Sequence, residues 1–189
     1  MAAKQSIVLV FFVISITIMT TTSSAKSFQA KNRAKGLDLG KETVTSIQFY
    51  FHDTVSGKTP SAVRVAEATD TEKSPTLFGA LLMADDPLTE TPDPKSKLLG
   101  RAQGLYGSAS QKDLCLIMAM NFGFTEGPYN GSSISLFGKN SALNNIREMP
   151  IVGGTGVFRL ARGYAAAKTH WFDPTTGDAI VGYNVTVVH

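Results

Sequence analysis

The sequence predicts an all-β domain folded as an antiparallel sandwich or barrel, and three observations lead to this prediction. Eight segments have the composition of strands, Gly, Pro, Asp and Asn separate them, and no segment keeps a helical period over three turns. A barrel of eight strands has an interior just wide enough for packed side chains or one small ligand. The candidate strands are residues 44–53, 62–68, 77–84, 98–108, 114–125, 132–138, 157–169 and 178–188.

The first 42 residues precede this domain and divide into two parts. Lys4, a hydrophobic run at 7–19 and small residues at 23–25 predict that residues 1–25 are a signal peptide. Residues 26–42 contain five basic side chains and few apolar ones, which predicts a flexible segment before a single domain at 43–189. The mature protein is expected to be secreted. No second hydrophobic stretch follows, so the sequence does not predict attachment to a membrane.

Charge and cysteine content narrow the function classes. Loss of residues 1–25 lowers the formal net charge from +3 to +2, and the basic residues are scattered, so no nucleic-acid partner is indicated. The single cysteine, Cys115, lies in an apolar strand pattern and is interpreted as a core residue rather than a nucleophile. Asn130 and Asn184 begin sequons for N-glycosylation, which an exported chain can carry.

The first strand, at 44–53, predicts where a carboxylate enters the interior. Side chains alternate along a strand, so Asp53 ends the apolar row of Ile47, Phe49 and Phe51. His52 then points to the other face, which argues against a dyad with Asp53. Alternatively, Asp53 simply ends the strand as a turn residue.

Two acidic residues near the third strand are interpreted as part of a turn. Asp85 and Asp86 stand directly before Pro87, a pattern more typical of a turn than of a catalytic pair or a metal site. The three histidines are scattered and form no constellation of metal ligands. Neither a metal nor a cofactor is therefore expected.

The strand at 114–125 is apolar in both of its rows. One row is strongly apolar from Leu114 to Phe124, and the other contains Cys115, Ile117 and Ala119. A strand of this kind is predicted to be buried on both sides, with one side covered by another chain. The pattern therefore predicts a homo-oligomer.

The glycine-rich segment at 147–165 predicts a sharp turn. Gly153, Gly154 and Gly156 permit positive φ or close backbone contact, and a strand is expected to begin at Val157, with Arg147 on the lead-in. A phosphate-binding loop would need Gly-Lys-Ser/Thr, or a following helix with an acidic residue about 20 positions later. The segment is therefore interpreted as structural.

Four motifs spread over the chain resemble those of the plant dirigent family and occur in that family's order. They are the segments Phe49–Asp53, Asp85–Thr89, Gly100–Tyr106 and Arg147–Gly163. The resemblance implies an eight-stranded antiparallel β-barrel of the dirigent and allene oxide cyclase type, assembled as a homotrimer and secreted to the apoplast, with a pocket in each barrel. Members direct phenolic intermediates, either quinone methides or phenoxy radicals made by a separate laccase or peroxidase, toward one stereoisomer.

The resemblance also implies which residues form the site. The family's polar pocket residues fall on Asp53, Tyr106 and Arg147, and substrate contacts are expected from Phe51, Ser108 and Asn140. Lignan-forming members have tyrosine where this chain has Ser108 and aspartate where it has Asn140, which weakens the case for coupling of coniferyl alcohol radicals. The Arg-Glu-Met-Pro sequence at 147–150 is similar to the non-lignan branch, which includes the legume pterocarpan synthases.

Quinone methide chemistry assigns a role to each polar residue. Arg147 would stabilise the charge that develops on the quinone methide oxygen, and Asp53 would transfer a proton. Tyr106 would donate to the leaving hydroxyl or hold the aromatic ring. Burial should raise the pKa of Asp53 unless Arg147 offsets it. The alternatives are that Arg147 pairs with Glu148 or another acid and that Tyr106 is a wall residue.

Three functions therefore stay open at this point. The favoured one is a lyase-type enzyme that dehydrates and cyclises a 2′-hydroxyisoflavanol, as the pterocarpan synthases do. The second is a mould that forms no bonds itself and directs coniferyl alcohol radicals made by an external oxidase. The third is a secreted protein that binds phenolics without chemistry.

Overall fold

The structure of the protein is a computed structural model that describes residues 41–189. The expected signal peptide and nearly all of the segment 26–42 lie outside the described residues. The strands are β1 (Val44–Asp53), β2 (Ala62–Ala66), β3 (Leu81–Thr89), β4 (Leu98–Ser108), β5 (Cys115–Phe124), β6 (Ser133–Ser141), β7 (Arg147–Thr155), β8 (Arg162–Phe172) and β9 (Ala179–Val188). Three 3₁₀ turns accompany them, η1 (Thr71–Lys73), η2 (Gly127–Tyr129) and η3 (Gly156–Phe158).

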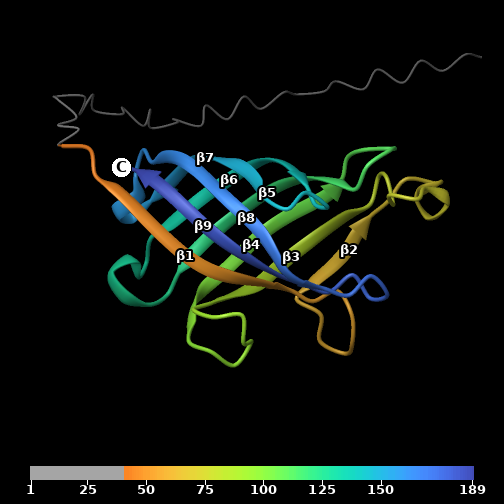
Figure 1. The fold of residues 1–189 in the computed structure, drawn as a ribbon, viewed down its shortest axis with the longest axis horizontal. Coiled ribbons are helices and arrows are strands. Elements are labelled where there is room, and N and C mark those ends of the chain that lie inside the picture. Colours follow the sequence, from red (N-terminus) through yellow and green to blue (C-terminus); the bar gives the residue numbers. More distant parts are fainter. Residues whose placement is uncertain (1–40) are drawn as a thin grey trace, which may run out of the picture. The chain divides into compact units, whose positions relative to one another are not determined.

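Eight of these strands form a closed antiparallel barrel, which confirms the predicted fold class. The order around the sheet is β1-β9-β8-β7-β6-β5-β4-β3, and β1 pairs with β3 to complete the ring (Figure 1). The contact between β1 and β9 is long and runs from Val44 opposite Val188 to Asp53 opposite Ala179. The contact that closes the ring is short, with Tyr50 opposite Thr89 and Phe51 opposite Leu88.

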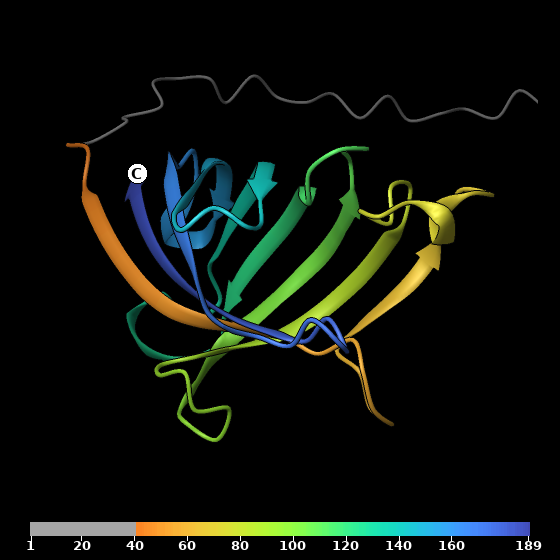
Figure 2. The same ribbon diagram turned by 45° about the vertical axis from the view of Figure 1, so that its right-hand side comes forward.

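One edge of β3 is shared between two strands. Strand β2 pairs with its first part, from Ala62 opposite Ala84, and β1 pairs with its last two residues (Figure 2). Between them, the amide of Asp85 donates to the Ser61 carbonyl at 2.8 Å. Pro87, the next residue facing this edge, has no N–H to satisfy, so proline is tolerated at the junction. We call this junction the β1/β2 seam.

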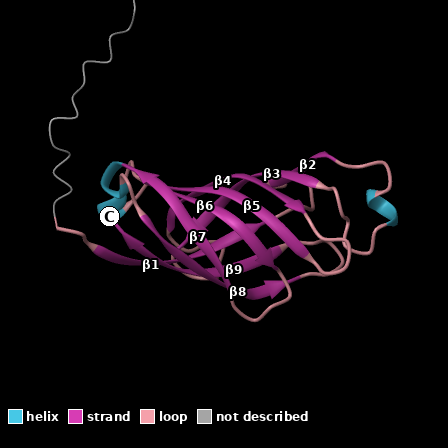
Figure 3. Ribbon diagram, turned by 90° about the horizontal axis from the view of Figure 1, so that it is seen from above, coloured by secondary structure: helices cyan, strands magenta, loops and turns pink. Residues whose placement is uncertain are grey.

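The inward rows of the strands form one apolar core that is most aromatic near η2 and η3. Phe49 lies 5.0 Å from Phe122 and 5.5 Å from Tyr183 between ring centroids, and Phe158 lies 6.0 Å from Phe124. Figure 3 shows the turns η2 and η3 at the end of the barrel near the C-terminus and η1 at the opposite end. The aromatic cluster therefore fills one end of the barrel, and we call this end the aromatic half.

The predicted strand bounds are confirmed for β1 and β4, whereas β3 differs. The segment Asp85-Asp86-Pro87 lies inside β3 and not in a turn, so that interpretation was wrong. Asp85 is exposed and Asp86 is buried, as expected for alternating residues of a strand. Cys115 is buried, in agreement with its interpretation as a core residue.

The glycine-rich segment also differs from its prediction. Residues Arg147–Thr155, including Gly153 and Gly154, form strand β7, and β8 begins at Arg162 rather than at Val157. The turn is the short η3, where Gly156 has φ +63° and a Cβ would clash with the Ser132 hydroxyl. Arg147 is thus a strand residue rather than part of a lead-in.

Two further expectations concern surfaces. In the single chain, Ile117 and Ala119 on the outer row of β5 are half-buried, so the expected burial on both sides is partial. Asn130 and Asn184, the sequon residues, are both exposed. Over residues 41–189, no helix is long and apolar enough to cross a bilayer.

Candidate functional site

The end of the barrel opposite the aromatic half carries polar side chains on its inner wall, and Asp53 is the first of them. It ends the inward row of β1, whose other members Ile47, Phe49 and Phe51 are buried. Its Oδ1 is buried without a hydrogen-bond partner among the described residues. The orientation predicted from strand alternation is therefore confirmed, and Asp53 faces the interior.

Burial is the main influence on the Asp53 carboxyl. It raises the pKa of Asp53 to about 6, the hydroxyl of Tyr106 lowers this pKa, and the charge of Asp178 raises it further. Arg147 is not among the groups that shift it. The expectation that burial would raise the Asp53 pKa is thus met, without an offset from Arg147.

Tyr106 comes from β4 and is 6% exposed. Burial, followed by the charge of Asp53, raises the pKa of its phenol above the ordinary value. The register of β3 and β4 places Gly104 opposite Ala84 in the next inward position. The Tyr106 hydroxyl acts on the Asp53 carboxyl and lowers its pKa, so the phenol and the carboxyl face each other.

Arg147 begins β7 and is 5% exposed. Its Nε donates to Asn140 Oδ1 at 3.1 Å, and one terminal nitrogen donates to Thr169 Oγ1 at 2.9 Å and to the Asn144 carbonyl at 3.4 Å. In the described part of the chain, no carboxylate lies within ion-pair distance of the guanidinium. The alternative that Arg147 pairs with Glu148 or another acid is therefore wrong.

The environment of Arg147 holds a cation in place without neutralising it. Burial lowers the pKa of Arg147, and Tyr183 raises it. Burial raises the pKa of Tyr183, and Arg147 opposes this shift. Because an arginine keeps its charge in proteins, this wall presents a buried positive group held by neutral acceptors.

The structure adds a second buried carboxyl that strand patterns did not predict. Asp86, on the inward row of β3 between Ala84 and Leu88, is 0% exposed, and neither of its carboxylate oxygens has a hydrogen-bond partner among the described residues. Burial, then the charge of Asp53, raises the pKa of Asp86 to about 7. The only sequence signal for this residue was its place in the Asp85–Thr89 motif.

Comparisons with known proteins identify the family. A family model described as "Dirigent-like protein" matches residues 44–188. The chain belongs to the dirigent family. It is 62% identical to Dirigent protein 23 of Arabidopsis thaliana, over 99% of this chain and 100% of the relative.

Dirigent proteins named for pterocarpan synthesis are also similar to this one. Pterocarpan synthase 1 of Glycine max is 49% identical, over 81% of this chain and 83% of the relative. A solved structure of a pterocarpan synthase dirigent protein superposes with a TM-score of 0.75 at 48% identity, covering 79% of this chain and 87% of that chain. These solved barrels have the same closed fold as this dirigent protein.

Of the three residues expected to contact substrate, two belong to the interior wall of the dirigent barrel and one holds a loop. Phe51 is buried in the core, and Asn140 is buried as the acceptor for Arg147. Ser108 is buried too, but its hydroxyl donates to the Thr76 carbonyl at 2.7 Å. Ser108 therefore holds the loop that contains Thr76, whereas Phe51 and Asn140 belong to the interior wall.

His52 points to the outer face, where its Nε2 lies 2.6 Å from Thr89 Oγ1.

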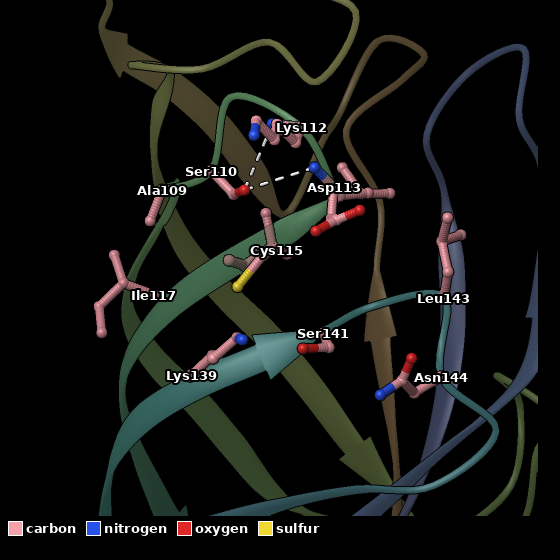
Figure 4. A pocket seen from close by; sticks show the side chains of 12 residues that line it. Ala109, Ser110, Lys112, Asp113, Cys115, Ile117, Lys139, Ser141, Leu143 and Asn144 are labelled. Carbon is pink, nitrogen blue, oxygen red and sulfur yellow. Dashed lines mark hydrogen bonds between the residues drawn. The ribbon is translucent and has the colours of Figure 1, made fainter.

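A cavity of about 720 Å³ lies at the rim of this end of the dirigent barrel. Figure 4 shows Cys115, Lys139 and Ser141 on its wall, beneath the loop that carries Ser110 and Lys112. It shares Asn144 with the surroundings of Arg147, but Asp53, Tyr106 and Arg147 do not line it. We place the site inside the barrel, because the rim residues Lys112 and Lys139 are exposed whereas the interior holds buried, unpartnered carboxyl oxygens.

The interior of the dirigent barrel can therefore perform proton transfer next to a fixed positive charge. Two carboxyls with raised pKa values can exchange protons near neutral pH, and Arg147 can stabilise a developing anion. Among residues 41–189, no group of side chains is arranged to hold a metal ion. Three residues of this interior were not predicted as site residues from the sequence, namely Asp86, Thr169 and Tyr183.

Proposed function

We propose that this dirigent protein is an enzyme that dehydrates and cyclises a 2′-hydroxyisoflavanol to a pterocarpan through a quinone methide. The observation that carries the proposal is the half-buried Asp53 carboxyl, which lies beside Tyr106 with its Oδ1 buried and its pKa raised to about 6. A mould for radicals made elsewhere needs shape but no proton acceptor. A buried carboxyl near its titration point is instead suited to general acid–base catalysis.

The reaction has four proton transfers to arrange, two in the loss of water and two in the ring closure. Asp53 takes the proton of the substrate phenol as the C–O bond to the alcohol oxygen breaks, and the departing oxygen takes a proton to leave as water. The 2′-hydroxyl then adds to the electrophilic carbon and loses its proton, while the former quinone methide oxygen regains one. The net change is loss of one water, and no oxidant is consumed.

Arg147 acts where negative charge develops. When the 2′-hydroxyl adds to the quinone methide, the quinone methide oxygen becomes a phenolate. A buried guanidinium held by Asn140 and Thr169 can stabilise this oxygen without reorganising. Because no carboxylate of the described residues pairs with Arg147, its charge is available to the substrate.

The relatives support the same assignment. The pterocarpan synthase of Glycine max is 49% identical to this chain, and two solved pterocarpan synthase dirigent proteins are 48% and 49% identical. The two solved barrels superpose on this chain with TM-scores of 0.75 and 0.73. The name of Dirigent protein 23, the 62% identical relative, specifies no substrate.

Chiral chromatography of products tests the proposal. The purified mature protein is offered racemic 2′-hydroxyisoflavanol alone and, separately, coniferyl alcohol with a laccase. We expect an optically active pterocarpan in the first reaction. Enantiomeric excess in the laccase reaction alone would instead show a mould for radical coupling, and binding without product in either would show a phenolic-binding protein.

Asp53→Asn separates chemistry from binding. The variant keeps the shape of the side chain but cannot accept the phenol proton, so we expect turnover to fall by about 10²–10⁴. Circular dichroism confirms that the barrel is folded, and binding of a pterocarpan product confirms the site. Turnover equal to wild type in a folded Asp53→Asn protein would remove Asp53 from the mechanism.

We also propose that the protein acts as a secreted homotrimer. Support comes from apolar side chains that stay exposed on the outer face of β6 and β7 and in the loop between them, namely Phe137, Ile146 and Val152. Analytical ultracentrifugation at micromolar concentration tests the assembly. A monomer at that concentration would contradict it.

A further inference from the structure

The seam between β1 and β2 brings two carboxyls together on the inner wall. Strand β1 pairs with β3 through Tyr50 opposite Thr89 and Phe51 opposite Leu88. The pairing of β1 with β3 ends there, and two residues further along each strand Asp53 of β1 and Asp86 of β3 both lie on the inward face. The charge of Asp53 raises the pKa of Asp86, as expected for neighbouring carboxyls. The two carboxyls therefore lie close together on the inner wall beside the seam.

Three of the four oxygens of these carboxyls are left without a hydrogen-bond partner among the described residues. Both oxygens of Asp86 and Oδ1 of Asp53 are buried without a hydrogen bond among residues 41–189. Arg101, whose charge lowers the pKa of Asp86, is on the outer face of β4, where its Nε donates to Asp85 at 2.5 Å. Two adjacent carboxylates with buried oxygens cannot both be charged without a large free-energy cost, whereas one proton held by the pair removes one of the two charges.

We infer that Asp53 and Asp86 form a carboxyl pair that holds one proton, and that Asp86 is a further catalytic residue, the acid that protonates the departing oxygen. This inference rests on the proposed dehydration. Asp53, ionised, takes the phenol proton as the C–O bond breaks, and the Asp86 proton goes to the leaving hydroxyl to form water. When the 2′-hydroxyl adds, its proton returns to Asp86, and Asp53 gives its proton to the phenolate oxygen.

Tyr106 is the competing acid, and its surroundings make it the weaker one. Burial and the Asp53 charge raise the pKa of the Tyr106 phenol, so it gives up a proton less readily than a free phenol. Asp86 has a pKa of about 7 and can donate at neutral pH. The other groups that influence Asp86 are Ser61 and Arg101, which lower its pKa, and the exposed Asp85, which raises it. Tyr106 then orients the substrate and the Asp53 carboxyl.

The pair itself can be observed without turnover. Protein with ¹³C-labelled aspartate carboxyl groups is titrated by NMR between pH 4 and pH 9, in wild type, Asp86→Asn and Asp53→Asn. We expect two coupled titrations near neutral pH in wild type and a single, lower one in each variant, because each variant removes the neighbouring charge. Asp85→Asn is the matched control and should leave both signals in place. Independent titrations near pH 4 in wild type would overturn the pair.

The acid role is tested by changing the leaving group. On 2′-hydroxyisoflavanol we expect Asp86→Asn to lose at least about 10²-fold in kcat/KM, Tyr106→Phe to lose less, and Asp85→Asn to match wild type. The 4-acetoxy derivative loses acetate, which needs no proton. Asp86→Asn should therefore recover most of its rate on this derivative, whereas Asp53→Asn should not.

The outcomes separate the two proposals. A folded Asp86→Asn with full activity on the alcohol, or one equally slow on both substrates, overturns the acid role while the proposed dehydration stands. Wild-type protein that forms no pterocarpan but shows coupled titrations overturns the proposed function, and the acid role with it, while the carboxyl pair stands.

Discussion

The two ends of the barrel interior are built on the same strands but differ in how their side chains are satisfied. In the aromatic half, Phe49, Phe122 and Phe158 are 0% exposed and pack ring against ring. At the opposite end, which we call the polar half, Asp53 and Asp86 keep carboxyl oxygens without hydrogen-bond partners among the described residues. Tyr183 belongs to both, since its ring stacks on Phe49 while its phenol influences Arg147.

The difference separates stability from function within one sheet. Burial of aromatic rings stabilises the fold, because removing apolar area from water is favourable and edge-to-face pairs add to it. Burial of unpaired carboxyls destabilises the fold, and such groups persist where chemistry needs them. The two halves should therefore respond in opposite ways to mutation.

The largest effect on stability is expected from the aromatic half. Phe122→Ala removes a fully buried ring that contacts Phe49 and Tyr183, and we expect the free energy of unfolding to fall by about 3–5 kcal/mol. Urea unfolding followed by circular dichroism measures this. Phe172→Ala, at an exposed position, is the control and should change stability by about 0.5 kcal/mol or less. Equal losses in the two variants would contradict the role of the aromatic cluster.

The next effect is on activity in the polar half. Arg147→Leu keeps apolar contacts but removes the buried cation, and we expect kcat/KM for cyclisation to fall by about 10²–10³, as for loss of one electrostatic stabiliser. Steady-state kinetics on folded protein measures it. Arg159→Leu, at an exposed arginine in the loop after η3, serves as the control. A loss confined to KM would show that Arg147 binds substrate without stabilising the transition state.

A smaller effect links the carboxyl pair to pH. The folded pKa of Asp86, about 7, is above its unfolded value of 3.8, so the folded state loses stability as pH rises from about 4 through 7. Asp86→Asn removes this loss. Its stability relative to wild type should therefore increase by about 2–3 kcal/mol between pH 5 and pH 8. Melting temperatures across this range measure the change, and a constant difference would contradict the buried charge.

The smallest effect on stability is expected at Asp85, the neighbour of Asp86 in the chain. Arg101 holds the pKa of Asp85 below its usual value, so the pair contributes stability above pH 4, but both side chains are exposed and water screens them. Asp85→Asn should cost about 0–1 kcal/mol and should not alter turnover. Thermal unfolding in low and high salt measures it. A large loss of activity in Asp85→Asn would show that an exposed aspartate of the Asp-Asp-Pro motif is also needed for turnover, so burial would not be what distinguishes Asp86.

Strand patterns predicted the parts of the fold where local signals agree. The bounds of β1 and β4 were correct because alternating rows meet clear turn residues at both ends, and the same alternation placed Asp53 inside. Strand β7 was missed because Pro150, Gly153 and Gly154 resemble a turn. The register with β8, where Pro150 lies opposite Tyr164, overrides that local preference.

The candidate site was predicted in part for the same reason. Arg147 and Tyr106 were assigned through family motifs, and the structure places both in the interior. Asp86 was read as a turn residue because its burial depends on β3 meeting β1 and β2 at the seam. That meeting joins residues far apart in the chain, so no local pattern reports it.

The long pairing of β1 with β9 has a consequence for the order of folding. Val44 lies opposite Val188, so the first strand of the domain finds its main partner only when the last strand is present. Contacts between residues so distant in sequence slow folding, because the chain must close a large loop before the pairing forms. Barrel closure is therefore expected to follow synthesis of nearly the whole chain, and truncation within β9 should prevent it.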